Sequence, residues 1–417
     1  MIVWAISRKS INNECILLQM MRKVERENVK NDIFLNQSFY IKDTEYSSKN
    51  AFIIAELGSS HGADPVKARE LIQAAAEAGA DCIKFQIVYA DEILHPKTGE
   101  VELPGGKIRL YDRFKELELP PSFFEEMKEL IEKLGLVFLC TPFGIKSARE
   151  LFSMSPKCVK IASPELNYTK LLKEIAHYGL PILLSTGVST LGDIDEALSL
   201  IEETSGSGQI NGNLKVSTPQ VCLLHCVTAY PAPEKDYNLR VLRSLSSIFG
   251  IPVGVSDHSL DRELVPVLGI SQGASVIEKH FCLSQDDPGL DDPIALPPSS
   301  FAAMVKSIRT AEKMSAEDII SSMCSEKGKD LVESILGDGV KRLAPSEKIN
   351  YKRTNRSIHA LKDIEEGEIL EPCKISSLRT EKLLRPGLPP SWEENIIGRR
   401  ARIFIPSGEG IRFEDIY

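Results

Sequence analysis

The sequence predicts an α/β protein whose larger part is a closed barrel of parallel strands. Between residues 51 and 315, eight short apolar runs alternate with eight segments of helical periodicity. Eight alternating strand and helix units over this length match the size and order of a TIM (β/α)8 barrel. A doubly wound open sheet is the alternative, which is disfavoured because no G-x-G-x-x-G fingerprint follows the first run.

The predicted strands are the eight apolar runs at residues 52–56, 82–86, 137–141, 158–162, 181–186, 221–226, 251–256 and 275–280. The predicted helices are residues 65–79, 121–135, 145–154, 168–179, 191–204, 238–250, 262–273 and 300–314. Several of these helices end in a glycine just before the next strand, as at Gly79, Gly135 and Gly250. Glycine at this place is a common helix C-terminal signal, so the elements follow one another through short turns.

Four parts of the chain are expected: an N-terminal extension at 1–50, the barrel at 51–315, a linker at 316–353 and a small module at 354–417. The extension is polar and lacks sustained periodicity, and Met20 and Met21 are possible later starts. The linker is charged and is expected to contain some helix. In the last part, short strands at 356–361, 374–380 and 400–405 are separated by Gly- and Pro-containing turns, which predicts a compact β-rich module.

Composition excludes several classes of protein. The 50 basic and 59 acidic side chains leave a formal charge of −9, so no general attraction to nucleic acid or to an anionic membrane is expected. No apolar stretch approaches the roughly 20 residues of a membrane span, and the N-terminus lacks a signal-peptide pattern. The nine cysteines are odd in number and several lie in apolar runs, which favours reduced thiols in a cytoplasmic protein.

Two lysines at predicted strand ends indicate a site for an anion. In such a barrel the active site lies at the C-terminal ends of the strands, where Lys84 and Lys160 are found. Ammonium and hydroxyl groups together can surround a phosphate. A single lysine at a strand end often only extends to the rim, but two lysines beside Thr141, Ser163 and Ser185 favour the anion site.

Two histidines indicate a metal site at the same end of the barrel. His258 and His280 end consecutive predicted strands, and neighbouring strands lie about 4.8 Å apart, so both imidazoles can reach one ion. With Glu278, Asp257 and Asp291 nearby and no cysteine pair at zinc spacing, manganese or magnesium is favoured over structural zinc. The adjacent His225 and Cys226 should point to opposite faces of their strand, so we interpret them as core residues.

Nine motifs occur in order at the strand ends. They are FIIAELGSSHG (52–62), IKFQ (83–86), CTPF (140–143), VKIASPEL (159–166), LLSTG (183–187), LHCVTAYPAP (224–233), VGVSDHSLD (253–261), VIEKHF (276–281) and PGLDDPIAL (288–296). Together they resemble the N-acetylneuraminate (sialic acid or nonulosonic acid) synthase family. NRSIHALKDIEEGEIL (355–370), followed by RPG (385–387), is similar to the antifreeze-like, or SAF, domain of the same proteins.

The resemblance implies a C–C bond-forming transferase. The family condenses phosphoenolpyruvate with an N-acylated mannosamine-type aldehyde, giving a nine-carbon 3-deoxy-2-keto acid and phosphate. It uses a divalent metal, most often Mn²⁺, with Mg²⁺ or Co²⁺ as alternatives. Family members are domain-swapped homodimers, in which an arginine at the position of Arg356 enters the partner's sugar site.

The resemblance also implies a role for each site residue. His258 and His280 are expected to bind the metal, and Glu56, Glu165, Tyr230, Glu278 and Asp291 are expected to face the sugar or the reacting atoms. The expected phosphoenolpyruvate ligands are Lys84, Thr141, Lys160, Ser163, Ser185 and Ser256. A carboxylate such as Glu56 or Glu165 could orient a water molecule for attack on carbon 2 of the substrate.

Three alternative functions remain open from the sequence. Legionaminic and pseudaminic acid synthases share most of the motifs, so the acceptor could be a 2,4-diacetamido-trideoxy hexose; Thr228, where bacterial sialic acid synthases often have Asn, leaves this choice open. A class I aldolase with a Schiff base on Lys160 is a second reading. A carbohydrate- or ice-binding protein with an inactive barrel is a third, disfavoured because the polar strand ends are all present.

Overall fold

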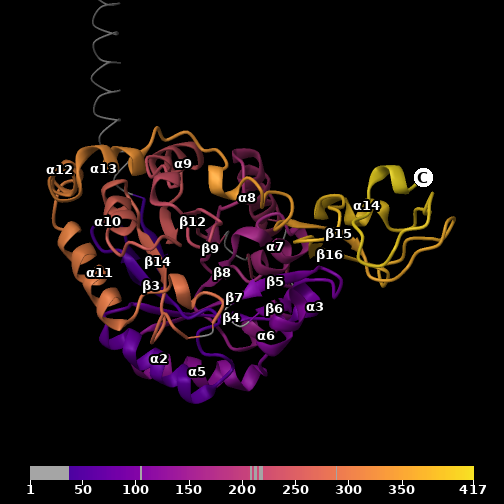
Figure 1. Cartoon of the computed structure of the whole chain (residues 1–417), viewed down its shortest axis with the longest axis horizontal. Coiled ribbons are helices and arrows are strands. Elements are labelled where there is room, and N and C mark those ends of the chain that lie inside the picture. Colours follow the sequence, from indigo (N-terminus) through magenta and orange to yellow (C-terminus); the bar gives the residue numbers. More distant parts are fainter. Residues whose placement is uncertain (1–36, 104–105, 207–208, 211–213, 216–218, 288) are drawn as a thin grey trace, which may run out of the picture.

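Eight parallel strands form a nearly closed barrel at the centre of the molecule (Figure 1). The structure, a computed structural model, describes residues 37–417 except 104–105, 207–208, 211–213, 216–218 and 288. The strand order is β7-β4-β3-β14-β13-β12-β9-β8, and the two end strands lie against each other. The prediction of a TIM barrel is therefore confirmed. The strands are β3 (Phe52–Glu56), β4 (Cys82–Ile87), β7 (Val137–Pro142), β8 (Val159–Ile161), β9 (Ile182–Ser185), β12 (Val221–Cys226), β13 (Val253–Asp257) and β14 (Val276–His280).

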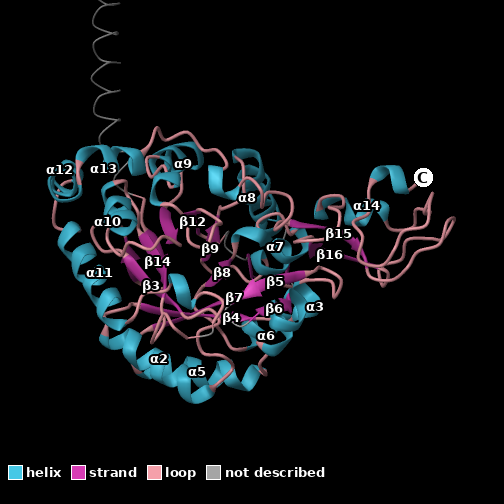
Figure 2. Ribbon diagram, in the orientation of Figure 1, coloured by secondary structure: helices cyan, strands magenta, loops and turns pink. Residues whose placement is uncertain are grey.

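Helices surround the barrel on the outside (Figure 2). They are α2 (Pro65–Glu77), α5 (Pro121–Lys133), α6 (Ile145–Ser153), α7 (Thr169–Ala176), α8 (Leu191–Gly206), α9 (Val241–Phe249), α10 (Leu264–Ser271) and α11 (Pro298–Ala311). Their ends follow local chemistry, as in α2, where the Asp64 carboxylate accepts a hydrogen bond from the N–H of Val66 and Pro65 opens the first turn. Gly79 follows with φ of +90°, a conformation that favours glycine.

A hairpin closes the N-terminal end of the barrel. It consists of β1 (Phe39–Ile41) and β2 (Thr44–Tyr46), whose apolar side chains pack on the first residues of the barrel strands, such as Phe52 and Cys82. Residues 37–50 are thus part of the packed structure, whereas we expected a loose extension. These two strands could not be predicted from hydrophobic periodicity, because each is only three residues long. Residues 1–36 of the expected extension lie outside the described residues.

The segment expected to be a linker begins with two helices, α12 (Ala316–Lys327) and α13 (Lys329–Leu336). Ile319 and Met323 of α12 and Val332 of α13 are buried in the main hydrophobic core. These helices extend the outer layer of the barrel against α10. From residue 337 the chain continues without a helix longer than the single turn η4 (Pro345–Glu347) and then enters the module.

An insertion between β4 and α5 covers part of the barrel mouth. It contains α3 (Ala90–Ile93), the hairpin β5 (Glu100–Leu103) and β6 (Gly106–Arg109), and α4 (Leu110–Glu116). A second hairpin, β10 (Gln209–Ile210) and β11 (Leu214–Lys215), follows α8. The remaining single-turn helices are η1 (Ser163–Glu165), η2 (Glu234–Asp236) and η3 (Asp292–Ile294).

The C-terminal module has its own core and lies beside the barrel (Figure 1). It contains β15 (Arg356–Ala360), β16 (Ile375–Arg379), η5 (Pro390–Trp392), α14 (Glu393–Ile396) and η6 (Phe413–Asp415). The first two predicted strands are present. The third, predicted at 400–405, is wrong, because this segment makes only isolated bridges, such as Ile364 with Ile405 and Ile369 with Arg400. The apolar residues of segment 400–405 fit a strand pattern, but in the structure single residues of this segment, and not a continuous run, pair with other parts of the module.

None of the helices among the described residues is both long enough and apolar enough to cross a membrane.

Candidate active site

The C-terminal ends of the barrel strands surround a cavity of about 370 Å³. Every predicted site residue lines it except Glu165, Arg356 and Asp257, the last of which is paired with Lys279. The lining residues that the sequence predicted are Glu56, Lys84, Thr141, Lys160, Ser163, Ser185, Tyr230, Ser256, His258, Glu278, His280 and Asp291. They come together because side chains of the same orientation in neighbouring parallel strands form layers inside a barrel.

Two lysines and two glutamates form an ion-pair network on the floor of this cavity. Lys84 Nζ lies 2.9 Å from Glu278 Oε1 and 3.2 Å from Glu56 Oε2. Lys160 Nζ lies 3.2 Å from the same Glu278 oxygen, and all four side chains are almost completely buried. Gln86 donates a 2.5 Å hydrogen bond to Glu56 Oε1. The network holds both ammonium groups in place before any substrate arrives.

The network also sets the protonation of its members. Burial alone would lower the pKa of Lys84, but Glu278 and Glu56 outweigh burial and raise it. Burial lowers the pKa of Lys160, and the nearby charge of Lys84 lowers it further. For Glu278, burial is outweighed by the two lysines, so its pKa falls below its usual range. Lys84 and Glu278 are therefore a charged pair, whereas the charge on Lys160 is the least stable of the three.

Several hydroxyl groups near the lysines are available to a ligand. The buried Oγ1 of Thr141 and Oγ of Ser185 have no hydrogen-bond partner among the described residues. Ser163 Oγ accepts a 3.0 Å hydrogen bond from the N–H of Gly187 and also hydrogen-bonds with the side chain of Cys226. Ser256 instead donates to Glu278 at 2.8 Å. Unpaired buried hydroxyls beside ammonium groups are typical of a site that an anion completes.

The two predicted metal ligands lie side by side. The rings of His258 and His280 have centroids 5.6 Å apart. His258 Nδ1 lies 2.9 Å from the carbonyl oxygen of Val227, so this nitrogen carries the proton and the lone pair of Nε2, near the Tyr230 hydroxyl, is the one that can bind a ligand. The buried Nδ1 of His280 has no hydrogen-bond partner and lies 3.9 Å from Asp291 Oδ2. The imidazole nitrogens of His258 and His280 and the nearby Asp291 carboxylate are the kinds of group that bind a divalent ion.

The described residues do not form a complete metal site by themselves. No group of three or more His, Cys, Asp or Glu side chains within the described ranges is arranged to hold an ion. Burial, with a further contribution from Glu56, raises the pKa of Asp291 to about 6. The ring of Tyr230 stacks on His258 with centroids 4.3 Å apart, and its hydroxyl lies 3.4 Å from Nε2. His258 and His280, with Asp291 beside them, are the residues that could hold an ion at this end of the cavity.

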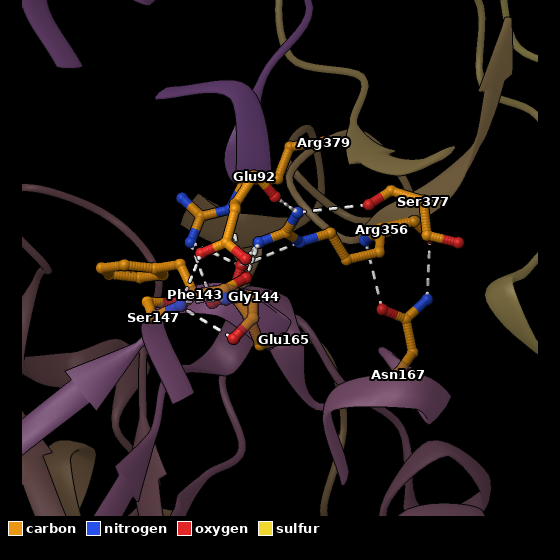
Figure 3. Close-up of polar contacts among 9 residues, drawn as sticks. All are labelled: Glu92, Phe143, Gly144, Ser147, Glu165, Asn167, Arg356, Ser377 and Arg379. Carbon is orange, nitrogen blue, oxygen red and sulfur yellow. Dashed lines mark hydrogen bonds and ion pairs between the residues drawn. The ribbon is translucent and has the colours of Figure 1, made fainter. Parts of the chain in front are cut away.

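Glu165 does not line this cavity, whereas the family resemblance implies that it faces the sugar or the reacting atoms. It ends the single turn η1, which turns its side chain away from the strand axis and towards the module. Its carboxylate is fully buried and accepts five hydrogen bonds from Arg356 and Arg379 (Figure 3). A carboxylate held in this way cannot act as a base on a substrate, so its role is to join the module to the barrel.

Arg356 lies against the barrel of its own chain. Its guanidinium binds Glu165 and also donates to the carbonyl oxygens of Glu92, Phe143 and Ser377 (Figure 3). The amide of Asn167 pairs with the backbone N–H and C=O of Arg356 at 3.1 and 2.9 Å. The side chain is completely buried and all its N–H directions are used. In this arrangement Arg356 anchors the module and does not line the cavity.

The sequence analysis missed the module residues that do line the cavity, which are Thr354, Arg379, Glu381 and Lys382. Arg379 is directly opposite Arg356 in the β15–β16 pair, so both guanidinium groups point the same way. The sequence hardly distinguishes Arg379 as a site residue, because a single arginine at the end of a short strand is common. Cys226, interpreted as core, also lines the cavity, while His225 points to the other face and lies 2.6 Å from the carbonyl oxygen of Tyr237.

Comparison with known proteins shows the family and the fold of the chain. The model of the NeuB family matches residues 71–319, and the SAF domain model matches residues 355–416. An N,N'-diacetyllegionaminic acid synthase of Legionella pneumophila is 32% identical over 89% of this chain and 96% of its own length. A pseudaminic acid synthase of Campylobacter jejuni is 30% identical over 88% and 97%. The crystal structure of spore coat polysaccharide biosynthesis protein spsE from Bacillus subtilis superposes with a TM-score of 0.73, at 31% identity over 91% and 99% of the two chains.

Proposed function

The chain belongs to the NeuB family, which includes nonulosonic acid synthases, and from this premise we propose that it condenses phosphoenolpyruvate with an N-acylated amino sugar. The products are a nine-carbon 3-deoxy-2-keto acid and phosphate. The observation that carries the proposal is the cavity in which two lysines, unpaired hydroxyls and two histidines meet. Relatives that make legionaminic and pseudaminic acids support a diacetamido acceptor as strongly as N-acetylmannosamine.

Phosphoenolpyruvate is proposed to bind at the lysine end of the cavity. Lys84 and Lys160 offset the charge of its phosphate and carboxylate groups, and the unpaired hydroxyls of Thr141 and Ser185 donate to the same oxygens. Glu278 keeps the two ammonium groups together despite their repulsion. The positions of these groups are fixed in advance, so little reorganisation accompanies binding.

The acceptor sugar is proposed to present its open-chain aldehyde to His258 and His280. A divalent ion, Mn²⁺ by preference, would be held by these two histidines and would supply Lewis-acid polarisation of the aldehyde. Tyr230 stacks on His258 and fixes its ring, and its hydroxyl can donate to the sugar. Asp291, with its raised pKa of about 6, can hold or release a proton near neutral pH at this end of the cavity.

Water attack on carbon 2 of the former enolpyruvate needs a carboxylate that faces the cavity. Glu56 satisfies this requirement, because it lines the cavity beside Lys84 while Glu165 does not. Burial and the neighbouring Glu278 raise the pKa of Glu56, which suits a group that takes up a proton. We therefore assign the water-orienting role to Glu56.

Phosphate release is the direct test of this function. Purified protein should release phosphate from phosphoenolpyruvate only when both an N-acylated amino sugar and Mn²⁺ are present, and mass spectrometry should find the condensed nine-carbon acid. Release that does not require the sugar would contradict the proposal. The Schiff-base aldolase reading is not favoured, because Lys160 Nζ is held by Glu278.

A homodimer with exchanged modules remains part of the proposal. The contacts between Arg356 and Glu165 can form within one chain, as here, or between two chains of a dimer. Mixing inactive His280→Ala subunits with inactive Arg356→Ala subunits distinguishes the two cases. If the modules are exchanged, one site of each hybrid dimer combines an intact barrel with an intact module, and activity returns. If each module stays on its own barrel, every site keeps one substitution and activity does not return.

A further inference from the structure

A loop at the barrel mouth is held by the segment that leads to the module, residues 341–355, which we call the strap. The loop, residues 186–188, directly follows Ser185, whose unpaired hydroxyl lines the cavity. The N–H of Gly187 donates a 3.0 Å hydrogen bond to Ser163 Oγ, and a Cβ atom at Gly187 would lie only 2.9 Å from that oxygen. The loop therefore packs tightly against the lysine end of the cavity, and a shift of the loop would displace Ser185.

The loop has a backbone conformation that its own sequence disfavours. Val188 has a φ of +43°, in the left-handed region, where a side chain branched at Cβ is strained. The side chain of Val188 is also completely buried. A residue other than glycine persists in this region only when its surroundings impose the conformation. Contacts made by the loop must therefore offset the strain at Val188.

Three side chains of the strap make these contacts. Lys341 Nζ donates a 2.9 Å hydrogen bond to the carbonyl oxygen of Thr186. The carboxylate of Glu347 accepts a hydrogen bond from the N–H of Val188. Asn355 Nδ2 donates at 3.2 Å to the carbonyl oxygen of Val188. The strap thus holds the loop by one backbone N–H and two carbonyl groups, on both sides of the residue that packs on the cavity wall.

The charged residues of the strap that hold the loop are buried. Glu347 is 1% exposed and Lys341 is 9% exposed. The second oxygen of Glu347 accepts a 3.0 Å hydrogen bond from the N–H of Ala344, which fixes the carboxylate. Burial lowers the pKa of Lys341, and the charge of Glu347 opposes this effect. Charged side chains are rarely buried without such partners, and a segment that only connects two units does not need them.

We infer that Lys341 and Glu347 are positioning residues for the anion site: by holding loop 186–188, they keep Ser185 where its hydroxyl donates to phosphoenolpyruvate. This inference rests on the proposed function and deepens it, because it gives the chain between barrel and module a role in substrate binding. Neither Lys341 nor Glu347 lines the cavity, so each acts through the loop and does not touch the substrate. The strap continues directly into β15 and thus connects the module to this end of the cavity.

Binding of phosphoenolpyruvate, measured by titration calorimetry without a sugar, tests the inference apart from turnover. Lys341→Met and Glu347→Ala should each raise its Kd about tenfold to a hundredfold, the effect of losing a hydrogen bond to a charged group. In turnover, KM for phosphoenolpyruvate should rise by a similar factor, while KM for the sugar changes little. Arg342→Met is the matched control, because this neighbouring side chain is exposed and pairs with Asp338 at the surface.

Val188→Gly separates positioning from a general loss of stability. Glycine adopts a positive φ without strain, so the loop then needs less support from Glu347. Val188→Gly should therefore restore part of the phosphoenolpyruvate affinity that Glu347→Ala loses, although the cavity it leaves lowers the melting temperature. If Glu347→Ala acted only by destabilising the protein, the double variant would bind phosphoenolpyruvate no better than Glu347→Ala alone.

Three results would overturn the inference. They are unchanged phosphoenolpyruvate binding in Lys341→Met and Glu347→Ala, no recovery on adding Val188→Gly, and a wild-type protein that binds neither phosphoenolpyruvate nor inorganic phosphate. If Glu347→Ala does not fold, the comparison of Lys341→Met with Arg342→Met decides. If no sugar supports phosphate release but the variants weaken phosphoenolpyruvate binding as expected, the synthase function fails while the role of the strap stands.

Discussion

Replacing Glu165 with glutamine should separate the module from the barrel. The side chains of Glu165 and Arg356 are fully buried and that of Arg379 is 10% exposed, so one carboxylate neutralises two buried cations. Arg356 and Arg379 are directly opposite each other in the β15–β16 ladder, where like charges repel. Glutamine keeps one oxygen acceptor but removes the negative charge, and it places an N–H2 group against guanidinium groups.

The cost follows from the burial of the ion pair. Removing one partner of a buried pair costs about 3–5 kcal/mol, because the remaining charge is left uncompensated. At about 1.4 kcal/mol for each factor of ten, the docking equilibrium should shift by between about a hundredfold and several thousandfold. Limited proteolysis between residues 337 and 355, together with calorimetric unfolding, measures this change.

A partly exposed ion pair in the same interface is the control. Lys170 Nζ lies 2.6 Å from Glu393 Oε1 across the junction of barrel and module; the Lys170 side chain is 40% exposed and that of Glu393 is 6% exposed. Lys170→Met should cost less than Glu165→Gln, because solvent screens this pair in part and Glu393 keeps its hydrogen bond from Ser377. If Glu165→Gln destabilises docking no more than Lys170→Met does, the assignment of Glu165 as the anchor is refuted.

Three further predictions concern the barrel. His258→Ala and His280→Ala should each lower turnover by orders of magnitude and weaken Mn²⁺ binding in calorimetry while melting normally; near-native activity in Mn²⁺ would show that the ligands are misassigned. Burial, aided by Lys67, lowers the pKa of His61 to about 4, so the free energy of unfolding should be constant above about pH 6.5 and fall by up to about 3 kcal/mol as the pH drops to 4. In denaturant titrations, His61→Asn should make the free energy of unfolding less dependent on pH between about 4 and 6.5. If that pH dependence is unchanged in the variant, groups other than His61 cause it. Borohydride should trap no pyruvate on Lys160, and an adduct found by peptide mass spectrometry would restore the aldolase reading.

The barrel was predictable from sequence because its signal is repeated. Each strand is a short apolar run and each helix has a single apolar face, so eight units support one another. The cavity residues followed from the same pattern, because the rule that polar strand ends converge needs only the strand limits. Lys84, Lys160, His258 and His280 were located in this way, and all four line the cavity.

The module contacts were not predictable, because they depend on how two separately packed units meet. Glu165 reads in the sequence as one more polar residue after a strand, and only η1 and the docked module show that it turns outward. Arg356 and Arg379 are separated by 23 positions, and their pairing depends on the register of a two-stranded sheet. The hairpin at 37–50 was missed for a related reason, since its three-residue strands are too short for periodicity.

The arrangement of charge in the cavity indicates which lysine has more N–H donors available for an anion. Lys84 is paired with two carboxylates, whereas Lys160 has one carboxylate oxygen, that of Glu278, as its hydrogen-bond partner among the described residues. An ammonium group has three N–H donors, so Lys160 retains two for a ligand. Burial and Lys84 lower the pKa of Lys160, and a bound phosphate would reverse that effect by supplying negative charge. Anion binding and protonation of Lys160 are therefore coupled, while Lys84 and Glu278 stay charged throughout.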